Sequence, residues 1–218
     1  MKKLITIIIA SFIFCGLAFS QESDKKALNL LEKVAKKTKS FQGFHVEFTF
    51  TVNNLHDSTK QSFDGDFWFR DKDYKLDMMN SVIYTDGETN WVYQEETGEV
   101  NITEHSENET SEFINPYSFL ENYEEDYTCR FVSDKFVHNR PIVEIHLFPE
   151  DIESSNYSRI VLKIDKSKNE LYQFIFAGNE GVNYMITVRQ LNTSKPVTKE
   201  DVTFNKSDYP DAEIIDMR

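Results

Sequence analysis

A change in hydrophobic period after Phe41 constrains the fold more than any other feature of this chain. From Phe44 to Val52, apolar side chains occupy every second position, and His45, Glu47 and two threonines lie between them. A period of two places alternate side chains on opposite faces of a β-strand. The segment therefore predicts a half-buried strand in a sheet that has one covered face.

Short segments with the same period follow along most of the chain. They are separated by turn sequences such as Asp86-Gly87 and Thr97-Gly98, and such short connections predict antiparallel neighbours. Two segments that meet at Asn80–Ser81 are also compatible with one strand, and we expect about eleven strands in one meander. The further strand segments are Ser62–Arg70, Lys75–Asn80, Ser81–Asp86, Asn90–Gln94, Glu99–Glu104, Thr128–Ser133, Lys135–Asn139, Ile142–Phe148, Ser158–Asp165, Glu170–Ala177, Val182–Leu191 and Val202–Asn205.

Two helices are expected beside these strands. The segment Ser23–Lys39 has apolar residues at helical spacing, a serine or Asp24 as its cap, and lysines in its last turn, where the helix dipole favours cations. The second helix follows Asn115-Pro116 and runs over Tyr117–Tyr123, because proline suits the first position of a helix. The apolar stripe of the first helix is Ala27, Leu28, Leu31, Val34 and Ala35.

The first twenty residues have the pattern of a cleaved secretory signal peptide. Lys2-Lys3 precedes the apolar run Leu4–Phe14, and Ala18-Phe19-Ser20 places small residues where a signal peptidase reads them. The apolar run is too short to span a membrane well. We therefore expect residues 1–20 to be removed and residues 21–218 to form a single domain, because no linker or internal repeat interrupts them.

The cysteines leave the mature chain without a disulfide. Cys15 lies in the signal segment, and lipid attachment there is disfavoured because Phe14 precedes it, whereas lipoprotein processing requires a small residue at that place. Removal of the segment leaves only Cys129, so no intramolecular disulfide forms. Only Arg130 adds a cation beside this thiol, and we expect it to be buried and inert rather than nucleophilic.

The charge of the chain excludes some classes of partner. It has 24 basic and 37 acidic residues and a formal charge of −13, so it would repel the phosphate backbone of a nucleic acid. An anionic membrane surface would repel it as well, unless a lipid or a basic patch intervened. The mean hydropathy of −0.52 indicates a soluble body.

The chain contains no recognisable catalytic or metal-binding motif. A G-x-S-x-G elbow, an H-E-x-x-H pair and a phosphate-binding loop are all missing from the sequence. His45 with Glu47, and His146 with Glu144, share a strand face, as in pairs that bind metal or act as acid and base. A solvated polar strand face is the favoured interpretation, because alternation places polar residues there. We expect no enzymatic activity, no metal and no cofactor.

The chain is rich in large aromatic side chains, and this bears on its fold and function. Aromatic residues make up 14% of the chain, and 18 residues are phenylalanine. A sheet of about eleven strands exposes more apolar surface than two short helices cover. The sheet either closes into a barrel or curls around an apolar cavity under a helical lid. The alternative is that the aromatics fill a sandwich core, which the pattern alone slightly favours. A cavity of this kind in an exported protein would suit acyl chains.

Several segments of the chain resemble a known protein family. Asp86-Gly87-Glu88-Thr89-Asn90-Trp91-Val92-Tyr93 resembles the D-G-x-x-x-W-x-Y signature of the outer-membrane lipoprotein carrier family, LolA. Further resemblances follow the order of the family and cover nearly the whole mature chain. They are Phe41-Gln42 with Phe48-Thr49, Gly65-Asp66-Phe67-Trp68-Phe69, Asn115-Pro116 through Leu120, Leu147-Phe148-Pro149, and Tyr209-Pro210-Asp211 through Asp216.

The sequence departs from the family pattern at two places. Family members often carry an Arg-Pro pair just after the second strand, where the arginine ties the lid to the sheet. Here that place reads Arg70-Asp71-Lys72, which makes Arg70, one residue out of register, the candidate lid latch. Phe50 stands where the family has glutamine after the Phe-Thr of the first strand.

The resemblance implies a fold and a function. The fold is mainly β: an incomplete, strongly curved antiparallel β-barrel of about eleven strands, whose concave face is covered by the N-terminal helix and the short inserted helix. The function is that of a monomeric periplasmic carrier, which takes acylated lipoproteins from an inner-membrane lipoprotein-releasing ABC transporter toward the outer membrane. An outer-membrane acceptor is a further candidate partner. The alternative is a lipid- or lipoprotein-sensing module of the same fold without a transport role.

Alternation and the resemblance together assign residues to the cavity and the lid. Within each strand, the assigned residues and the charged residues occupy alternate positions and so lie on opposite faces. Around Trp91 the pattern assigns no face. Met78, Met79 and Met185 would add deformable thioether walls. The expected cavity and lid residues are Leu28, Leu31, Val34, Phe48, Phe50, Phe67, Phe69, Tyr74, Leu76, Met78, Trp91, Tyr93, Phe119, Phe174 and Phe176.

Overall fold

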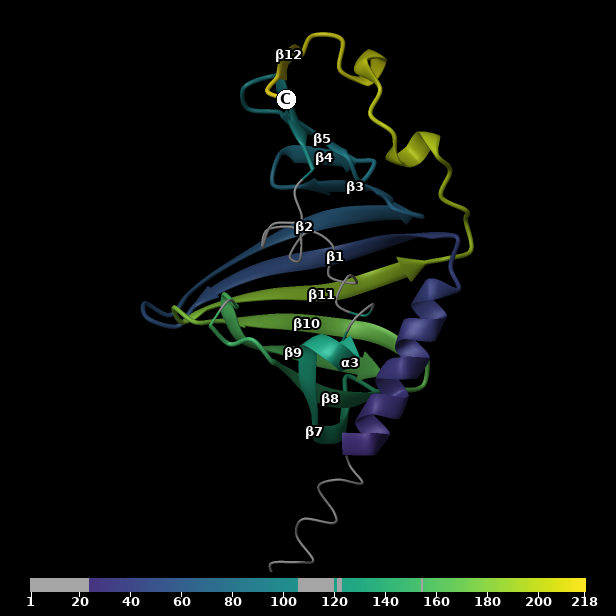
Figure 1. Cartoon of the computed structure of the whole chain (residues 1–218), viewed down its shortest axis with the longest axis vertical. Helices are drawn as coiled ribbons and strands as arrows, with labels where there is room; N and C mark the ends of the chain where they lie inside the picture. The colour runs from purple at the N-terminus through teal and green to yellow at the C-terminus, as the bar shows by residue number, and fades with distance from the viewer. Residues whose placement is uncertain (1–23, 106–119, 121–122, 154) are drawn as a thin grey trace, which may run out of the picture.

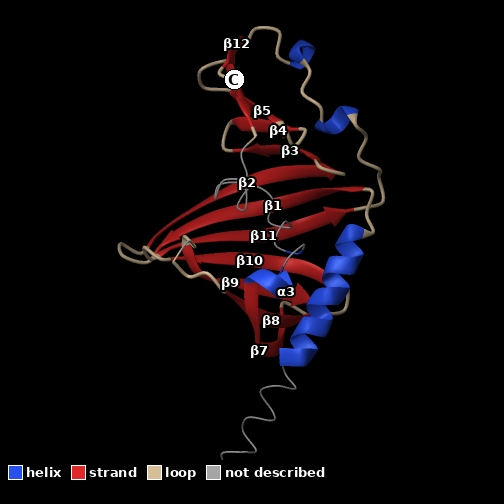
Figure 2. Cartoon of the chain, in the orientation of Figure 1, coloured by secondary structure: helices blue, strands red, loops and turns tan. Residues whose placement is uncertain are grey.

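The computed structural model describes residues 24–105, 120, 123–153 and 155–218. These residues form one curved, open sheet of twelve strands, with a helix over residues 24–39 beside it (Figure 1), and strands far outweigh helices (Figure 2). The strands are β1 (Gly43–Asn54), β2 (Thr59–Arg70), β3 (Asp73–Met78), β4 (Ser81–Thr85), β5 (Thr89–Gln94), β6 (Glu99–Glu104), β7 (Tyr127–Val137), β8 (Arg140–Pro149), β9 (Tyr157–Asp165), β10 (Glu170–Gly178), β11 (Val182–Asn192) and β12 (Glu213–Asp216). The short helices are α3 (Tyr123–Asp126), η2 (Glu200–Val202) and η3 (Lys206–Asp208).

The sheet consists of two meanders joined in the middle. From the centre, β1 to β6 run in order toward one edge and β11 back to β7 run toward the other, with β1 paired to β11. Neighbouring strands are antiparallel except β12, which pairs in parallel with β6 at the edge. The two edges do not pair with each other, so the sheet stays open. The prediction of a mainly β, incomplete and strongly curved barrel is confirmed, with twelve strands instead of about eleven.

The period-two pattern sets the inner face of the sheet. In β1, Phe44 pairs with Phe69 and Val46 pairs with Phe67 of β2, so the apolar sides of the two strands lie together. The same register continues through β11, β10, β9 and β8, and one hydrophobic cluster follows the inner face across these strands. A slip of one residue in any of these pairs would turn the apolar side chains outward, so burial of this face fixes the register.

A tight turn separates β3 from β4. Met79 and Asn80 have φ angles of 57° and 58°, which is the left-handed conformation at both central residues of a type I′ hairpin turn. Asparagine tolerates this conformation better than most residues, because its short amide group bonds locally. The turn resolves the ambiguity at Asn80–Ser81 in favour of two strands.

The strand predictions fail at the C-terminal end of the chain. The segment Val202–Asn205, predicted as a strand, contains the end of the 3₁₀ helix η2, and its Val202 is buried. The strand β12 was not predicted; only its pairing with β6 makes its four residues a strand. Local alternation carries no information about such a long-range parallel pair.

The strand β7 is one element where the sequence predicts two. The predicted segments Thr128–Ser133 and Lys135–Asn139 merge into β7, which pairs with β8 along its length. A register shift between Phe131 and Ser133 changes the alternation in its middle. Such a bulge inserts one residue and so reverses which alternate side chains face inward. The sequence pattern of one bulged strand therefore resembles that of two strands.

The outer face of β4, β5 and β6 holds a second, smaller core. Register places Trp91 beside Tyr84 and Tyr93 beside Val82, on the face opposite to the main cluster. Residues of the C-terminal segment cover this face: Phe204 stacks on Trp91 with ring centroids 6.0 Å apart. The prediction that Trp91 and Tyr93 line the concave face is therefore wrong. On β5 the large aromatic side chains point to the outer face, which the C-terminal segment covers. The second core contains Val100, Ile102 and Ala212, with Trp91, Tyr93, Phe204 and Tyr209 packed around it.

The predicted inserted helix falls mostly outside the described residues. Of the segment Tyr117–Tyr123, the structure describes Leu120 and Tyr123, and both are buried in the main hydrophobic cluster. Tyr123 begins the short helix α3, which continues beyond the predicted end. Phe119, an expected lid residue, also lies outside the described residues.

We expect the replacement Phe204→Ala to lower the free energy of unfolding by about 2 kcal/mol, because it removes a half-buried ring from the stack on Trp91. The matched control is Phe136→Ala, since Phe136 is 79% exposed and should change stability by less than about 0.5 kcal/mol. Denaturant unfolding of both variants measures the difference. Equal effects would contradict a second core built on the C-terminal segment.

Candidate functional site

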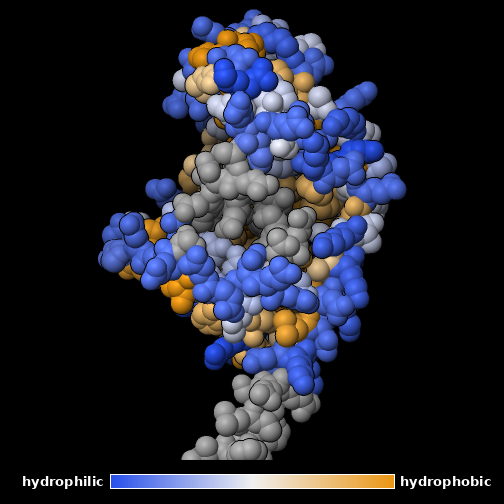
Figure 3. Space-filling view, in the orientation of Figure 1, coloured by the Kyte–Doolittle hydropathy of each residue, from blue (hydrophilic) through white to orange (hydrophobic). Residues whose placement is uncertain are grey.

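The candidate site is the inner face of β1 to β4 together with β11. Several apolar side chains on this face are only half-buried, and we call the region lined by five of them the hollow. Figure 3 shows patches of apolar surface among the mostly hydrophilic residues on this side of the molecule. The half-buried side chains that define the hollow are Phe50, Phe69, Met78, Ile83 and Tyr184.

The other part of the inner face is a closed core. Phe174 of β10 is fully buried, and Phe176 beside it is nearly so. Their neighbours on β8 and β9, including Ile145 and Leu162, are also fully buried. The two interpretations of the aromatic excess thus each describe one part of the sheet. Side chains on β8 to β10 fill a core that continues over the buried Phe48, Phe67 and Leu76 of β1 to β3, whereas the five half-buried side chains border a partly open region.

Most of the expected cavity residues lie on the inner face, but they differ in exposure. Phe50, Phe69 and Met78 are half-buried in the hollow. Two of the other residues differ from expectation: Met79 lies in the β3–β4 turn and is 52% exposed, and Met185 pairs with Thr51 on the outer face. Those that are buried on the inner face are Phe48, Phe67, Tyr74, Leu76, Phe174 and Phe176.

Sequence reasoning missed two residues of the hollow, Ile83 and Tyr184. Tyr184 is half-buried, and its ring stacks against Phe50 with centroids 6.3 Å apart. The register brings it there, because Val52 of β1 pairs with Tyr184. The alternation of β11 was the available signal, but it does not say which of its two faces points inward.

The N-terminal helix packs against the closed part of the inner face. Its residues Leu31 and Val34 are almost completely buried, and Leu28 is half-buried at the edge of the same cluster. The helix therefore presents its predicted apolar stripe to the sheet. In Figure 1 it runs along the ends of the strands from β7 to β11, whereas β2 to β4 lie beyond its last turn.

Polar contacts hold both ends of this helix. At its start, the Asp24 carboxylate accepts a hydrogen bond of 2.8 Å from the backbone N–H of Phe131 in β7. At its end, the Lys37 ammonium donates to the carbonyl of Lys168 at 2.8 Å and to the Glu170 carboxylate at 2.9 Å. The helix is thus tied to β7 and to the β9–β10 turn by bonds that water could replace.

Arg70 does not hold the helix in the described structure. Its guanidinium donates a hydrogen bond of 2.7 Å to the carbonyl of Val197, and it lies 3.6 Å from the Asp71 carboxylate. Val197 belongs to the segment that leads from β11 to η2. The prediction of Arg70 as the lid latch is corrected, because its bond fastens the C-terminal segment to the end of β2.

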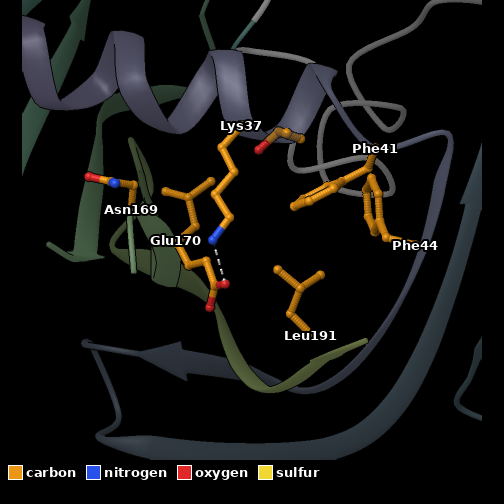
Figure 4. Close-up of a pocket in the computed structure, with 8 residues that line it drawn as sticks. Lys37, Phe41, Phe44, Asn169, Glu170 and Leu191 are labelled. Carbon is orange, nitrogen blue, oxygen red and sulfur yellow. Dashed lines mark hydrogen bonds and ion pairs between the residues drawn. The ribbon is translucent and has the colours of Figure 1, made fainter. Parts of the chain in front are cut away.

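A small pocket lies at the seam between the end of the helix and the sheet (Figure 4). The Lys37–Glu170 ion pair forms one side of the pocket, and Phe41 and Phe44 form the other. The pocket lies where the last turn of the helix meets β1, β10 and β11. Its remaining lining residues are Thr38, Asn169, Leu171 and Leu191.

Cys129 lies on the inner face beneath the start of the helix. It packs against the main cluster, and its neighbour in register is the fully buried Leu147. Burial, and to a smaller extent the Asp24 carboxylate, raises the pKa of the Cys129 thiol to about 12. The thiol is therefore protonated at neutral pH, which is the opposite of an activated nucleophile.

The histidine pairs lie on the outer face. His45 contacts Asp66 of the neighbouring strand at 2.6 Å rather than its own neighbour Glu47, and its ring stacks on Trp68. His146 contacts Glu144 at 3.0 Å as predicted. Within residues 24–105, 120, 123–153 and 155–218, no three His, Cys, Asp or Glu side chains gather as metal ligands would. Both pairs act as polar contacts on a strand face.

The helices in the described part of the chain give no membrane span. None of them combines the length and the apolar character that crossing a bilayer requires.

Comparison with known proteins identifies the family and the fold. The family described as "Outer membrane lipoprotein carrier protein LolA" matches residues 39–205. The match includes β1 to β11 and the turn into η2. No curated protein matches the chain.

Two solved structures share the fold at low identity. An uncharacterized conserved protein from Thermus thermophilus is 11% identical with a TM-score of 0.56; the match covers 88% of this chain and 99% of that one. A DUF1329 family protein from Desulfovibrio piger is 11% identical with a TM-score of 0.50; the match covers 83% of this chain and 97% of that one. These likenesses concern the fold alone.

We expect Cys129 to react slowly with thiol reagents in the folded protein. Raising its pKa to about 12 lowers the thiolate population at pH 8 by about a thousandfold relative to an ordinary thiol, and the helix restricts access. The measurement is the rate of labelling at pH 8 in a chain with Cys15→Ser, with the denatured protein as the control. A native rate within tenfold of the denatured rate would contradict a half-buried thiol of raised pKa that the helix shields.

Proposed function

The chain belongs to the family of the outer membrane lipoprotein carrier protein LolA, and we propose that it carries acylated lipoproteins by shielding their acyl chains in the hollow. The observation that carries this proposal is the half-buried apolar lining of β1 to β4 and β11 in a chain with a formal charge of −13. A contiguous apolar surface that stays partly exposed on a soluble protein indicates a binding site.

The energetics of acyl chains require a carrier of this kind. Each buried CH₂ group contributes about 0.8 kcal/mol, so one long acyl chain represents on the order of 10 kcal/mol in water. Phenylalanine, tyrosine and methionine line the hollow, and the flexible thioether of Met78 adapts to a chain of variable shape. A surface of this composition binds hydrocarbon without specific polar contacts, which suits a carrier that serves many lipoproteins.

The N-terminal helix serves as the movable part of the site. Its stripe is buried against β8 to β10, and its two ends are held by the Asp24 and Lys37 hydrogen bonds. Separation along the seam would enlarge the hollow toward the closed core, and return of the helix would cover the bound chain. Leu28, which is half-buried at the edge of the cluster, would then contact the acyl chain.

The family and the sequence support a cellular role in the periplasm for this carrier. Residues 1–20 would direct export, and the mature protein would work in the periplasm as a monomer. It would receive lipoproteins from an inner-membrane lipoprotein-releasing ABC transporter and deliver them to the outer membrane, directly or through an acceptor there. No catalytic step belongs to this role.

The test is the replacement Phe50→Glu, which puts a carboxylate on the floor of the hollow. Burial of that charge under a bound chain is unfavourable by several kcal/mol, so affinity for a fluorescent acyl ligand should fall about a hundredfold. In the open hollow the carboxylate reaches water, so the melting temperature should change little. The matched control is Gln190→Glu, which adds the same charge at an exposed position of β11.

The outcomes separate a binding site from ordinary core. Loss of acyl binding with a near-normal melting temperature supports the hollow, provided that Gln190→Glu binds normally. Loss of stability and binding together would make Phe50 a core residue and contradict the proposal. Transfer of a bound lipoprotein to outer-membrane vesicles then distinguishes a carrier from a sensing module, which would bind without transfer.

A further inference from the structure

The exposed face of the N-terminal helix is unusually basic for this chain. Six of the 24 basic residues lie within residues 24–39, against two acidic ones, although the whole chain carries −13. At 100° per residue these lysines fall on the side of the helix opposite to its buried stripe. We call them the lysine face; it consists of the exposed Lys25, Lys26, Lys33, Lys36 and Lys39 and the half-buried Lys37.

Local ion pairs neutralise only part of the lysine face. Lys36 pairs with Glu32 on the same helix at 2.6 Å, and Lys37 pairs with Glu170 of β10 at 2.9 Å. Lys25, Lys33 and Lys39 have no ion-pair partner in the part of the chain that the structure describes. The excess acidic charge of the chain lies elsewhere and is screened over about 8–10 Å at physiological ionic strength, so the lysine face acts locally as a cationic surface.

We infer that the lysine face docks the protein on anionic lipid headgroups, so that the helix and the seam beside it meet the membrane surface. Charge complementarity carries this inference, because an anionic bilayer attracts a row of lysines although it repels the rest of the chain. The face contains lysine and no arginine, and lysines are flexible point charges without the fork geometry that recognises a single carboxylate or phosphate. That composition suits a diffuse, charged surface better than one acidic site on a protein.

The inference deepens the proposed function and rests on it for its purpose. The same helix buries its apolar stripe against the inner face and ends beside the seam pocket (Figure 4). Headgroup contact would therefore bring the part of the protein that opens toward the surface from which acyl chains come. Attraction of Lys37 to lipid phosphates would also compete with its bond to Glu170.

The test is sedimentation of the purified protein with vesicles. Vesicles of phosphatidylglycerol and phosphatidylethanolamine provide the anionic surface, and vesicles of phosphatidylcholine provide the neutral one, at 20 and 300 mM NaCl. The wild type should bind the anionic vesicles at low salt and lose most of this binding at high salt. Lys25→Gln with Lys33→Gln should weaken binding more than tenfold, since each lysine near an anionic surface contributes about fivefold.

The matched control is Lys60→Gln with Lys72→Gln, which removes the same charge from exposed positions on and beside β2. Unchanged binding in this control and loss in the helix variant support the inference. Equal binding of the two variants, or no binding of the wild type to anionic vesicles, would overturn it. A wild type that ignores vesicles but binds an acidic protein through the same lysines would likewise overturn it in favour of a protein partner.

A second measurement keeps this inference apart from the proposed function. Acyl-ligand binding without vesicles should be the same in the helix variant and in the wild type, because neither lysine belongs to the hollow. Vesicle binding lost with acyl binding intact would confirm a docking role separate from the hollow. Normal vesicle docking by a protein that binds no acyl ligand would contradict the proposed function and leave the docking surface standing.

Discussion

The architecture depends on a mismatch between the area of the sheet and the length of the helix that covers it. Twelve strands spaced by about 4.8 Å span about 50 Å across the sheet. A helix over residues 24–39 is only about 24 Å long. The inner side chains of β8 to β10 are almost completely buried, and so are Phe48, Phe67 and Leu76 on β1 to β3. Phe50, Phe69, Met78 and Ile83 on β1 to β4 stay half-buried. The hollow thus lies in a sheet that is about twice as wide as the helix is long.

The residues on the outer face also differ from one part of the sheet to another. On β1 and β2 the outer face is polar, with pairs such as His45 and Asp66 in contact with solvent. On β4 to β6 the outer face is apolar and needs its own cover, which Phe204 and Tyr209 provide. Lys199 and Arg70 fasten that cover by their contacts with Asp73 and Val197. The short strands at this edge are therefore also stabilised from outside, while on their inner face Ile83 packs against the main cluster.

Much of the fold could be predicted because alternation is a local property. The pairing of Phe44 with Phe69 follows from two apolar faces that must meet, and the break between β3 and β4 follows from turn residues. The family signature around Trp91 also pointed to the correct fold. What failed depends on long-range contacts. The same Trp91 was placed on the wrong face, because the segment that covers it lies more than a hundred residues later in the chain.

The candidate site shows the same division between local and distant information. Phe50 and Met78 could be placed on the inner face from parity alone, whereas their partial exposure could not, since it depends on where the helix ends. The contacts of Lys37 with Glu170 and of Arg70 with Val197 join residues 133 and 127 positions apart, and no local pattern indicates them. Their geometry reassigns Arg70 from a lid latch to an anchor of the C-terminal segment.

The central claim is that acyl chains lie on the inner face of β1 to β4 and β11. The most direct measurement is photo-crosslinking with a synthetic diacyl lipopeptide that carries a diazirine near the end of one acyl chain, followed by mass-spectrometric mapping of the adducts. The account predicts adducts on inner-face residues such as Phe50, Met78 and Tyr184, and their loss when unlabelled lipopeptide competes. Adducts confined to the outer cluster around Trp91 and Phe204, or adducts that competition does not reduce, would contradict it.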